Sequence, residues 1–247
     1  MNKQAKIYSE LKTSLAELRN IIFPASCAGC GEPCLSEKTL CAKCYNKLNF
    51  LSAYKCRQCG YEAEHLMNDI CGNCLQKPPY FERFYGVVSY DDFAASLVGR
   101  LKFGDHLNIV PIIGQLMAAS LDDIEPSTIV TPVPLHWRRR IKRRFNQSAE
   151  LSRYIGKAKG LQYIPSLVQR IKATKPQIGQ SGYQRQQNLK NAFRFNPKYS
   201  TLNKGQILLV DDVLTTGSTA QSVAKILKRQ GFSVSLVVFA RVEGHLR

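Results

Sequence analysis

Long apolar runs and acidic residues are scarce in this chain of 247 residues. No apolar stretch approaches the roughly 20 residues that a membrane-spanning helix needs. The first residues lack the continuous apolar core of a secretory signal peptide, so we expect a cytoplasmic protein. Only 18 acidic residues balance 35 basic ones, which leaves a formal net charge of +17. That excess favours a polyanionic partner, with nucleic acid the first candidate and an anionic lipid surface the second.

Nine cysteines would suggest disulfides in a secreted protein, but eight of them fall into four C-x2-C pairs. The pairs are Cys27/Cys30, Cys41/Cys44, Cys56/Cys59 and Cys71/Cys74. In a cytoplasmic chain each pair presents two thiolates to one tetrahedral ion, so four pairs predict two structural Zn²⁺ sites. The spacing leaves open whether neighbouring pairs share an ion or whether the first pair joins the third in a cross-braced arrangement. Cys34 is left over, and we expect it to be an unliganded thiol.

A strand, a polar loop and a helix near the end of the chain form its most informative pattern. Residues 207–210 are apolar and lead into Asp211 and Asp212. The loop that follows offers hydroxyls and one glycine, at Thr215, Thr216, Gly217, Ser218 and Thr219. Backbone amides of such a loop, and of the first turn of a helix expected over 220–230, can face a phosphate. The pattern therefore predicts an anion-binding loop.

The two aspartates narrow the choice of ligand. Carboxylates beside a phosphate are unfavourable unless sugar hydroxyls or a divalent cation lie between them. Phosphoribosyl pyrophosphate (PRPP) with Mg²⁺ supplies both, and the segment resembles the PRPP-binding motif of type I phosphoribosyltransferases. The loop lacks the lysine of a P-loop, which argues against an NTPase. The simpler alternative is a helix capped by Asp212 and Thr215, but a cap needs only one such residue.

The chain is expected to divide near Pro78–Pro79 into an N-terminal helix with a double zinc-finger module, 1–80, and an α/β domain, 81–247. Strands alternate with helices in the second part, which predicts a parallel sheet whose ligand binds beyond the carboxyl ends of the strands. The expected strands are 84–90, 129–133, 207–211 and 233–241, and the expected helices are 93–103, 109–121 and 147–159. The polar segment 172–196 is expected to be a mobile loop or lid over the site.

The densest basic cluster runs from Arg138 to Arg144, between Trp137 and Phe145. It can line a groove that follows a phosphate backbone, with aromatic rings available to stack on bases. The alternative is a solvated helix start beside a pyrophosphate site, and the two interpretations are compatible. Apolar residues at helical spacing over 7–22 predict a helix that packs on its own protein rather than on a membrane surface.

Several stretches resemble the ComF/GntX family of competence-associated, phosphoribosyltransferase-like proteins. Besides the four cysteine pairs, they are Asn20–Pro24, Lys77–Pro79, Leu101–Asp105, Thr131–His136, Arg143–Gln147, and the pattern Thr174-x-x-Gln177 followed by Arg185, Asn188 and Phe193. Two positions depart from the family pattern. Arg144 replaces a glycine, which adds bulk and charge beside the expected pyrophosphate site, and Gln180 replaces a leucine.

The resemblance implies a type I phosphoribosyltransferase fold with a zinc-finger module at its N-terminus. It also implies a role in natural transformation, in which the protein handles incoming single-stranded DNA at the inner face of the cytoplasmic membrane. The implied partners are a DNA-translocating helicase and a recombination loader of the competence machinery. No phosphoribosyl acceptor follows from the resemblance.

Three functions are compatible with these features. The first is a DNA-handling protein that uses a PRPP-type site to bind or sense a ligand. The second is an active phosphoribosyltransferase that moves ribose 5-phosphate from PRPP to a nitrogen acceptor. The third is an adaptor with a vestigial phosphate site, which the intact acidic pair and loop disfavour. An amidotransferase is disfavoured because the N-terminus offers no catalytic cysteine.

For the enzyme, each part of the expected site has a role. Residues 215–219 would hold the 5-phosphate. Asp211 and Asp212 would hold the ribose hydroxyls, directly or through Mg²⁺, and would stabilise the positive charge that develops on the ribose as pyrophosphate leaves. Candidates for contacts with the pyrophosphate are His136, Arg138 and Lys175.

Overall fold

The computed structural model describes residues 25–34, 39–103, 109–135, 146–171, 192–244 and 246. The chain forms two compact units, 1–47 and 48–247. The expected module boundary near Pro78–Pro79 stays a prediction. The helix expected over 7–22 and the cluster from Arg138 to Arg144 lie outside the described residues. Among those that are described, no helix combines the length and the apolar character needed to cross a bilayer.

The described part of the first unit is organised around four cysteines. Gly31 adopts a φ of +81°, a left-handed conformation that favours glycine, and its amide donates to the carbonyl of Cys27 at 2.8 Å. The one-turn helix α2 (Ala42–Tyr45) follows Cys41, whose carbonyl accepts from the amide of Tyr45 at 2.8 Å. So small a unit has little apolar surface to bury, and a shared metal is the usual way to stabilise it.

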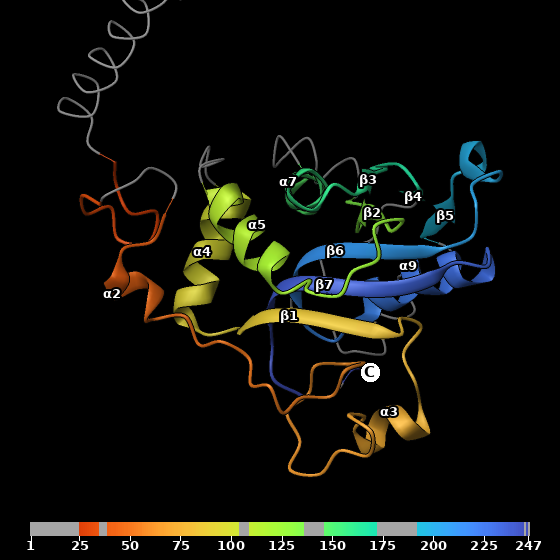
Figure 1. Cartoon of the computed structure of the whole chain (residues 1–247), viewed down its shortest axis with the longest axis horizontal. Coiled ribbons are helices and arrows are strands. Elements are labelled where there is room, and N and C mark those ends of the chain that lie inside the picture. Colours follow the sequence, from red (N-terminus) through yellow and green to blue (C-terminus); the bar gives the residue numbers. More distant parts are fainter. Residues whose placement is uncertain are drawn as a thin grey trace, which may run out of the picture. The chain divides into compact units, whose positions relative to one another are not determined.

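A five-stranded parallel sheet forms the centre of the second unit (Figure 1). In spatial order its strands are β1 (Arg83–Ser89), β7 (Ser233–Arg241), β6 (Gln206–Leu214), β2 (Ile129–Pro132) and β3 (Gln162–Tyr163). Strands of a parallel sheet are covered on both faces, so their sequences are apolar without interruption. In β7 every residue after Ser233 is buried. The expected fold class, a parallel sheet flanked by helices, is confirmed.

Helices cover both faces of this sheet. On one face α5 (Ile109–Ala119) and α7 (Gln147–Lys159) contact each other, and α4 (Asp92–Phe103) contacts α5. The opposite face carries α9 (Ser218–Arg229), which contacts β6 and β7 (Figure 1). The connections β2–α7–β3 and β6–α9–β7 run in opposite directions along the sheet, and right-handed crossovers then place their helices on opposite faces.

The core beneath α9 shows the alternation of a strand. Ile207 and Leu209 of β6 belong to the same buried cluster as Val223 and Leu227 of α9. Residues two apart in a strand point to the same face, so the even-numbered neighbour Leu208 points toward the other layer of helices. This packing holds β6 between α9 and the helices of the other layer.

A second, antiparallel sheet pairs β4 (Val168–Arg170) with β5 (Phe193–Phe195), and the 3-10 helix η1 (Pro197–Tyr199) follows β5. The expected loop over 172–196 is therefore wrong at its end, because β5 lies within it. Phe193 and Phe195 are buried in the cluster beneath α9, and a strand of three residues is too short to recognise from alternation. The remainder of that segment, 172–191, lies outside the described residues.

The second cysteine module belongs to the same compact unit as the sheet. It contains the short helix α3 (Gly72–Gln76). Gly60, with a φ of +67°, packs so closely on the ring of Phe84 in β1 that a Cβ at this glycine would overlap the ring. The amide of Phe84 also donates to the carbonyl of Arg57 at 2.7 Å. The module is thus held to the edge of the sheet by packing and by backbone hydrogen bonds.

Candidate ligand and metal sites

The loop after β6 is built as the sequence predicts, with small differences at its edges. β6 continues to Leu214 rather than ending at Asp211, and α9 begins at Ser218 rather than at residue 220. Gly217 is the N-cap residue and has a φ of +73°. The amide of Gln221 closes the first helical hydrogen bond, to the carbonyl of Gly217 at 2.8 Å. The amides of residues 218–220 come before this first bond and have no carbonyl partner within the helix. They can therefore donate to an anion.

Two hydroxyls of the loop are already oriented relative to each other. Thr216 Oγ1 and Ser218 Oγ lie 2.9 Å apart, within hydrogen-bond distance. Gly217 carries no side-chain cap for the amides that follow it. The helix start thus combines free amide positions with two neighbouring hydroxyls, which is a suitable arrangement for the oxygens of a phosphate.

The acidic pair lies directly before this loop and is held by two helices from the other face of the sheet. Asp211 Oδ1 accepts hydrogen bonds from Ser148 Oγ at 2.9 Å and from the amide of Asp212 at 3.0 Å. Asp212 Oδ1 accepts from the amide of Val213 at 2.8 Å, and its Oδ2 lies 2.9 Å from Lys102 Nζ. Ser148 comes from the first turn of α7, and Lys102 from the last turn of α4.

The protonation of Asp211 is set by these surroundings. Burial raises the pKa of Asp211 to about 7, and the neighbouring charge of Asp212 acts in the same direction. The hydrogen bonds from Ser148 and from the amide of Asp212, together with the charge of Lys102, act in the opposite direction. The pair is therefore poised to exchange a proton near neutral pH, and a cation or a set of hydroxyl donors would stabilise its charged form.

Lys102 and Ser148 are site residues that the pattern around the loop does not identify. Lys102 lies within the stretch Leu101–Asp105, which carries part of the family resemblance but no predicted role. Ser148 follows Gln147, where the helix of α7 begins. Neither residue has a local signature, because each is brought to the acidic pair by the packing of a helix on the sheet.

Only some of the expected site residues are among the described ones. Among the candidate site residues, the structure brings Asp211, Asp212 and residues 215–219 together at the carboxyl edge of β6. His136, Arg138 and Lys175 lie outside the described residues, so their contacts with pyrophosphate stay predictions.

The cysteines form two groups, and neighbouring pairs share each group. Cys27, Cys30, Cys41 and Cys44 make the first cluster, and Cys56, Cys59, Cys71 and Cys74 make the second. Within each cluster all Sγ atoms lie within 4.8 Å of one another. The structure thus selects sequential pairing over the cross-braced alternative.

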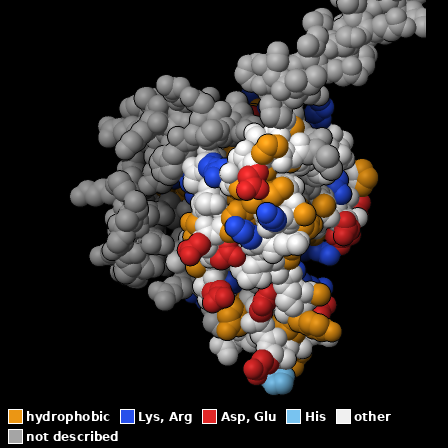
Figure 2. Space-filling view, turned by 90° about the vertical axis from the view of Figure 1, so that its left-hand side faces the viewer, with side chains coloured by type: hydrophobic (Ala, Val, Ile, Leu, Met, Phe, Trp, Pro, Cys, Tyr) orange, Lys and Arg blue, Asp and Glu red, His pale blue; other side chains and the backbone are white. Residues whose placement is uncertain are grey.

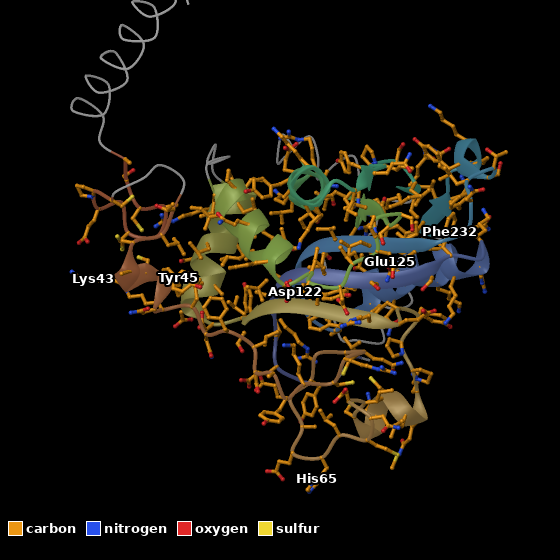
Figure 3. The ribbon with its side chains drawn as sticks, viewed as in Figure 1. Lys43, Tyr45, His65, Asp122, Glu125 and Phe232 are labelled. Carbon is orange, nitrogen blue, oxygen red and sulfur yellow. The ribbon has the colours of Figure 1, made fainter. Side chains whose placement is uncertain are left out.

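The spacing of the sulfur atoms matches a tetrahedral zinc site. A Zn–S bond of about 2.3 Å in tetrahedral geometry places sulfur atoms about 3.8 Å apart. The Sγ atoms of Cys30 and Cys41 are 3.8 Å apart, and those of Cys59 and Cys71 are 3.7 Å apart. Figure 3 shows sulfur atoms gathered beside α3, whereas His65 lies at the far tip of that module. Four thiols without histidine or carboxylate are the ligand set of a structural zinc site.

The first cluster is already prepared for a cation. Burial raises the pKa of Cys27, but hydrogen bonds from the backbone of Cys41, Cys30 and Gly29 outweigh this effect and lower it to about 6. Burial, and to a smaller extent the neighbouring thiols, raise the pKa of Cys44 to about 12. Ionisation of one thiol therefore makes ionisation of its neighbours less favourable. A bound dication would offset this charge repulsion, and its binding would release protons.

Cys34, the ninth cysteine, lies outside both clusters. Its Sγ is 3.7 Å from Thr39 Oγ1 and belongs to neither four-thiol group. That it is an unliganded thiol stays a prediction.

Two segments outside the described residues hold much of the chain's basic excess. Figure 2 shows acidic and basic side chains interspersed over the described part of one face. In the sequence, residues 136–145 contain six basic and no acidic residues, and residues 172–191 contain four basic and no acidic residues. In the sequence, residues 136–145 lie between β2 and α7, the helix that supplies Ser148 to Asp211.

Comparisons with known proteins identify relatives over most of the chain. Residues 18–75 match the model of a family described as double zinc ribbon domain. Competence protein F of Haemophilus influenzae is 30% identical over 217 residues, covering 85% of this chain and 93% of that protein. DNA utilization protein YhgH of Salmonella typhimurium is 34% identical over 218 residues, covering 85% of this chain and 94% of that protein.

Two solved structures show a loose likeness to part of the chain. The glutamine PRPP amidotransferase of Bacillus subtilis is 16% identical with a TM-score of 0.35, over 52% of this chain and 25% of that one. The adenine phosphoribosyltransferase of Thermoanaerobacter pseudethanolicus is 12% identical with a TM-score of 0.33, over 52% of this chain and 77% of that one. Scores of this size carry no conclusion about ligands or activity.

Proposed function

Because the chain belongs to the ComF/GntX family, with competence protein F and DNA utilization protein YhgH among its relatives, we propose that it handles single-stranded DNA in the cytoplasm during DNA uptake. We further propose that it binds PRPP or a related ribose phosphate, with Mg²⁺, at the loop formed by residues 215–219. The DNA-translocating helicase and recombination loader that the resemblance implies are the partners in this proposal, and the inner face of the membrane is the place.

The ribose-phosphate proposal rests mainly on one observation. The hydrogen-bonded pair Asp211 and Asp212 lies directly before a helix start whose N-cap, Gly217, provides no side chain. The helix start attracts anions, and the carboxylates attract hydroxyls or a cation. A ligand that satisfies both parts carries a phosphate at one end and vicinal hydroxyls or a metal at the other. PRPP has this distribution of groups.

When no ligand is bound, Lys102 balances the negative charge of Asp212. Its Nζ lies 2.9 Å from Asp212 Oδ2, and the two side chains are only 22% and 13% exposed. When Mg²⁺ is bound, it supplies positive charge that orients the hydroxyls and pyrophosphate oxygens of the ligand. The hydrogen bond from Ser148 keeps the carboxylate of Asp211 oriented.

Single-stranded DNA would be held by the basic residues of 136–145. Ten residues with six positive charges and no negative charge favour phosphate contacts, and Trp137 and Phe145 offer rings for stacking.

An active phosphoribosyltransferase is the second candidate, and the acidic pair is the feature that favours it. Transfer from PRPP breaks the bond between the anomeric carbon and pyrophosphate, and positive charge develops on the ribose. Ionised Asp211 and Asp212 would stabilise that charge. With a pKa of about 7, Asp211 could also take up a proton released by a nitrogen acceptor.

Calorimetric titration of PRPP into zinc-loaded protein, with and without Mg²⁺, tests the ligand proposal. We expect binding that requires Mg²⁺ and is lost in Asp211→Asn/Asp212→Asn. Asp122→Asn, an exposed carboxylate, is the matched control and should bind as wild type does. Wild-type protein that is folded and does not bind PRPP would refute the proposal. Release of pyrophosphate in the presence of a base or nucleotide, stopped by the double variant, would establish the enzyme.

Fluorescence anisotropy with a labelled oligonucleotide at two salt concentrations tests the DNA proposal. Charge reversal at Arg138–Arg140 and at Arg143–Arg144 should weaken binding and flatten its dependence on salt, because fewer counterions are released. Equal affinity of variant and wild type at both salt concentrations would contradict a role for this segment in DNA binding.

A further inference from the structure

Arg241 is a buried cation that connects the second cysteine cluster to the end of the chain. It is the last residue of β7, and it is 4% exposed. Its Nε donates to the carbonyl of Cys59 at 2.8 Å, and its Nη1 donates to the carbonyl of Val242 at 2.8 Å. Its Nη2 donates to the carbonyl of Gly244 at 2.6 Å. A single guanidinium thus joins a metal-ligand residue to the tail that follows β7.

The tail after β7, which includes Val242, Gly244 and Leu246, contacts the loop 215–217 at the proposed phosphate site, called the ligand loop from here on. The amide of Val242 donates to the carbonyl of Leu214 at 2.9 Å, and Leu214 is the residue directly before the loop 215–217. Leu246 lies over the loop, because a Cβ on Gly217 would come within 2.7 Å of Leu246 Cδ2. Leu246 also packs against the second cysteine cluster and against the core that contains Leu214 and Ala220.

We propose that the second four-cysteine cluster positions the ligand loop, and that Arg241 is the positioning residue through which it acts. The affinity for PRPP in this inference rests on the proposed function, whereas the effect on the loop does not. A metal bound to Cys59 fixes the backbone carbonyl that holds the guanidinium, and the guanidinium fixes the tail that flanks the loop. Groups in contact with metal ligands are commonly coupled to the metal in this way.

Charge as well as geometry supports this link. Four thiolates around one Zn²⁺ carry a formal net charge of about −2, and a buried guanidinium beside them compensates part of it. Without the metal the four thiols have no common partner, so the knuckle that carries Cys59 loses its main constraint. Arg241 would then hold a mobile carbonyl, and the tail at Val242 and Leu246 would loosen around the loop.

The two clusters provide a matched pair of variants. Cys74→Ser removes one ligand from the second cluster, and Cys44→Ser removes one from the first, which belongs to the other compact unit. Hydrogen exchange of the peptide covering residues 214–221, zinc content and calorimetric titration of Mg²⁺ and PRPP are measured on both. For Cys74→Ser we expect exchange of that peptide to become about fivefold faster and the Kd for PRPP to rise about tenfold, as for ordinary coupling between sites. Cys44→Ser should leave both values within about twofold of wild type, below the usual range of such coupling.

Arg241→Lys is the second variant, and it keeps the cluster intact. Lysine retains the charge but lacks the planar fork that reaches three carbonyls. We expect full zinc content together with faster exchange in residues 214–221. This variant decides the matter if circular dichroism shows that Cys74→Ser is globally unfolded.

The outcomes separate the two proposals. If wild-type protein does not bind PRPP but Cys74→Ser still loosens the loop, the positioning role stands and the proposed ligand is wrong. The positioning role is overturned if Cys74→Ser loses its zinc and Arg241→Lys keeps its zinc, and neither variant changes the hydrogen exchange of residues 214–221. An equal effect of Cys44→Ser would also overturn it, because the coupling would then not be specific to the second cluster.

Discussion

Replacing Asp211 by asparagine should make the folded protein more stable at alkaline pH. Burial and the charge of Asp212 raise the pKa of this carboxyl from 3.8 to about 7. In the unfolded chain the carboxyl titrates near its ordinary value, so between the two values the folded state binds the additional proton. Stability therefore falls as the pH rises from about 4 to about 7. Asparagine has no charge to bury and escapes this loss.

The size of the effect follows from the difference between the two pKa values. At 1.36 kcal/mol per pH unit it amounts to an upper limit of about 4 kcal/mol in the free energy of unfolding. We expect Asp211→Asn to be more stable by about 2 to 4 kcal/mol above pH 8, and by about 1 kcal/mol at pH 5. The amide oxygen of asparagine can still accept from Ser148 and from the amide of Asp212, since both bonds end on Oδ1.

Urea unfolding between pH 5 and pH 9 measures this difference, with zinc present throughout. Asp122→Asn removes an exposed carboxylate and is the control for the change in net charge. A gain that is the same at every pH, or a loss of stability at pH 9, would refute the account of Asp211 as a carboxyl that is costly to ionise. The stabilised variant should also fail to bind PRPP, as expected when a binding site is held at a cost in stability.

Three further outcomes are expected. Lys102→Met should lower the free energy of unfolding by about 1 to 3 kcal/mol, because it leaves the carboxylate of Asp212 without its ion pair, and urea unfolding beside Lys102→Arg checks this. Dye titration after denaturation should find two zinc ions per chain in wild type and one in Cys44→Ser; two in the variant would contradict the four-thiol site. Gly217→Ala should weaken PRPP binding and cost about 1 kcal/mol of stability through its positive φ, and adding Leu246→Ala should recover only the part that arises from crowding.

Local features of the sequence were sufficient for much of the architecture. The helix over 147–159 and the strand over 233–241 have the expected bounds, because their apolar residues repeat with the period of a helix or fill a strand that is covered on both faces. The phosphate-type loop is recognisable for a similar reason. Its glycine, hydroxyls and carboxylates lie within nine residues, from Asp211 to Thr219, so one segment of chain carries the whole pattern.

Short or tightly packed segments were harder to predict. β5 has only three residues, too few for alternation to distinguish it from the polar segment before it. β6 extends past Asp211 to Leu214 because its pairing with β7 continues there, a property of the neighbouring strand rather than of the carboxylates themselves. The ends of elements are therefore decided by partners that a local pattern does not contain.

By itself, the sequence determined the fold class, the two four-thiol sites and the loop between β6 and α9. Each of these depends on patterns of residues that are close along the chain. Only the tertiary structure decided that neighbouring cysteine pairs share each site, because both pairings satisfy the same spacing. It also brought Ser148 to Asp211, and Arg241 to Cys59, across separations of 63 and 182 residues. Such contacts depend on how helices and knuckles pack on the sheet, and packing joins residues irrespective of their distance in the chain.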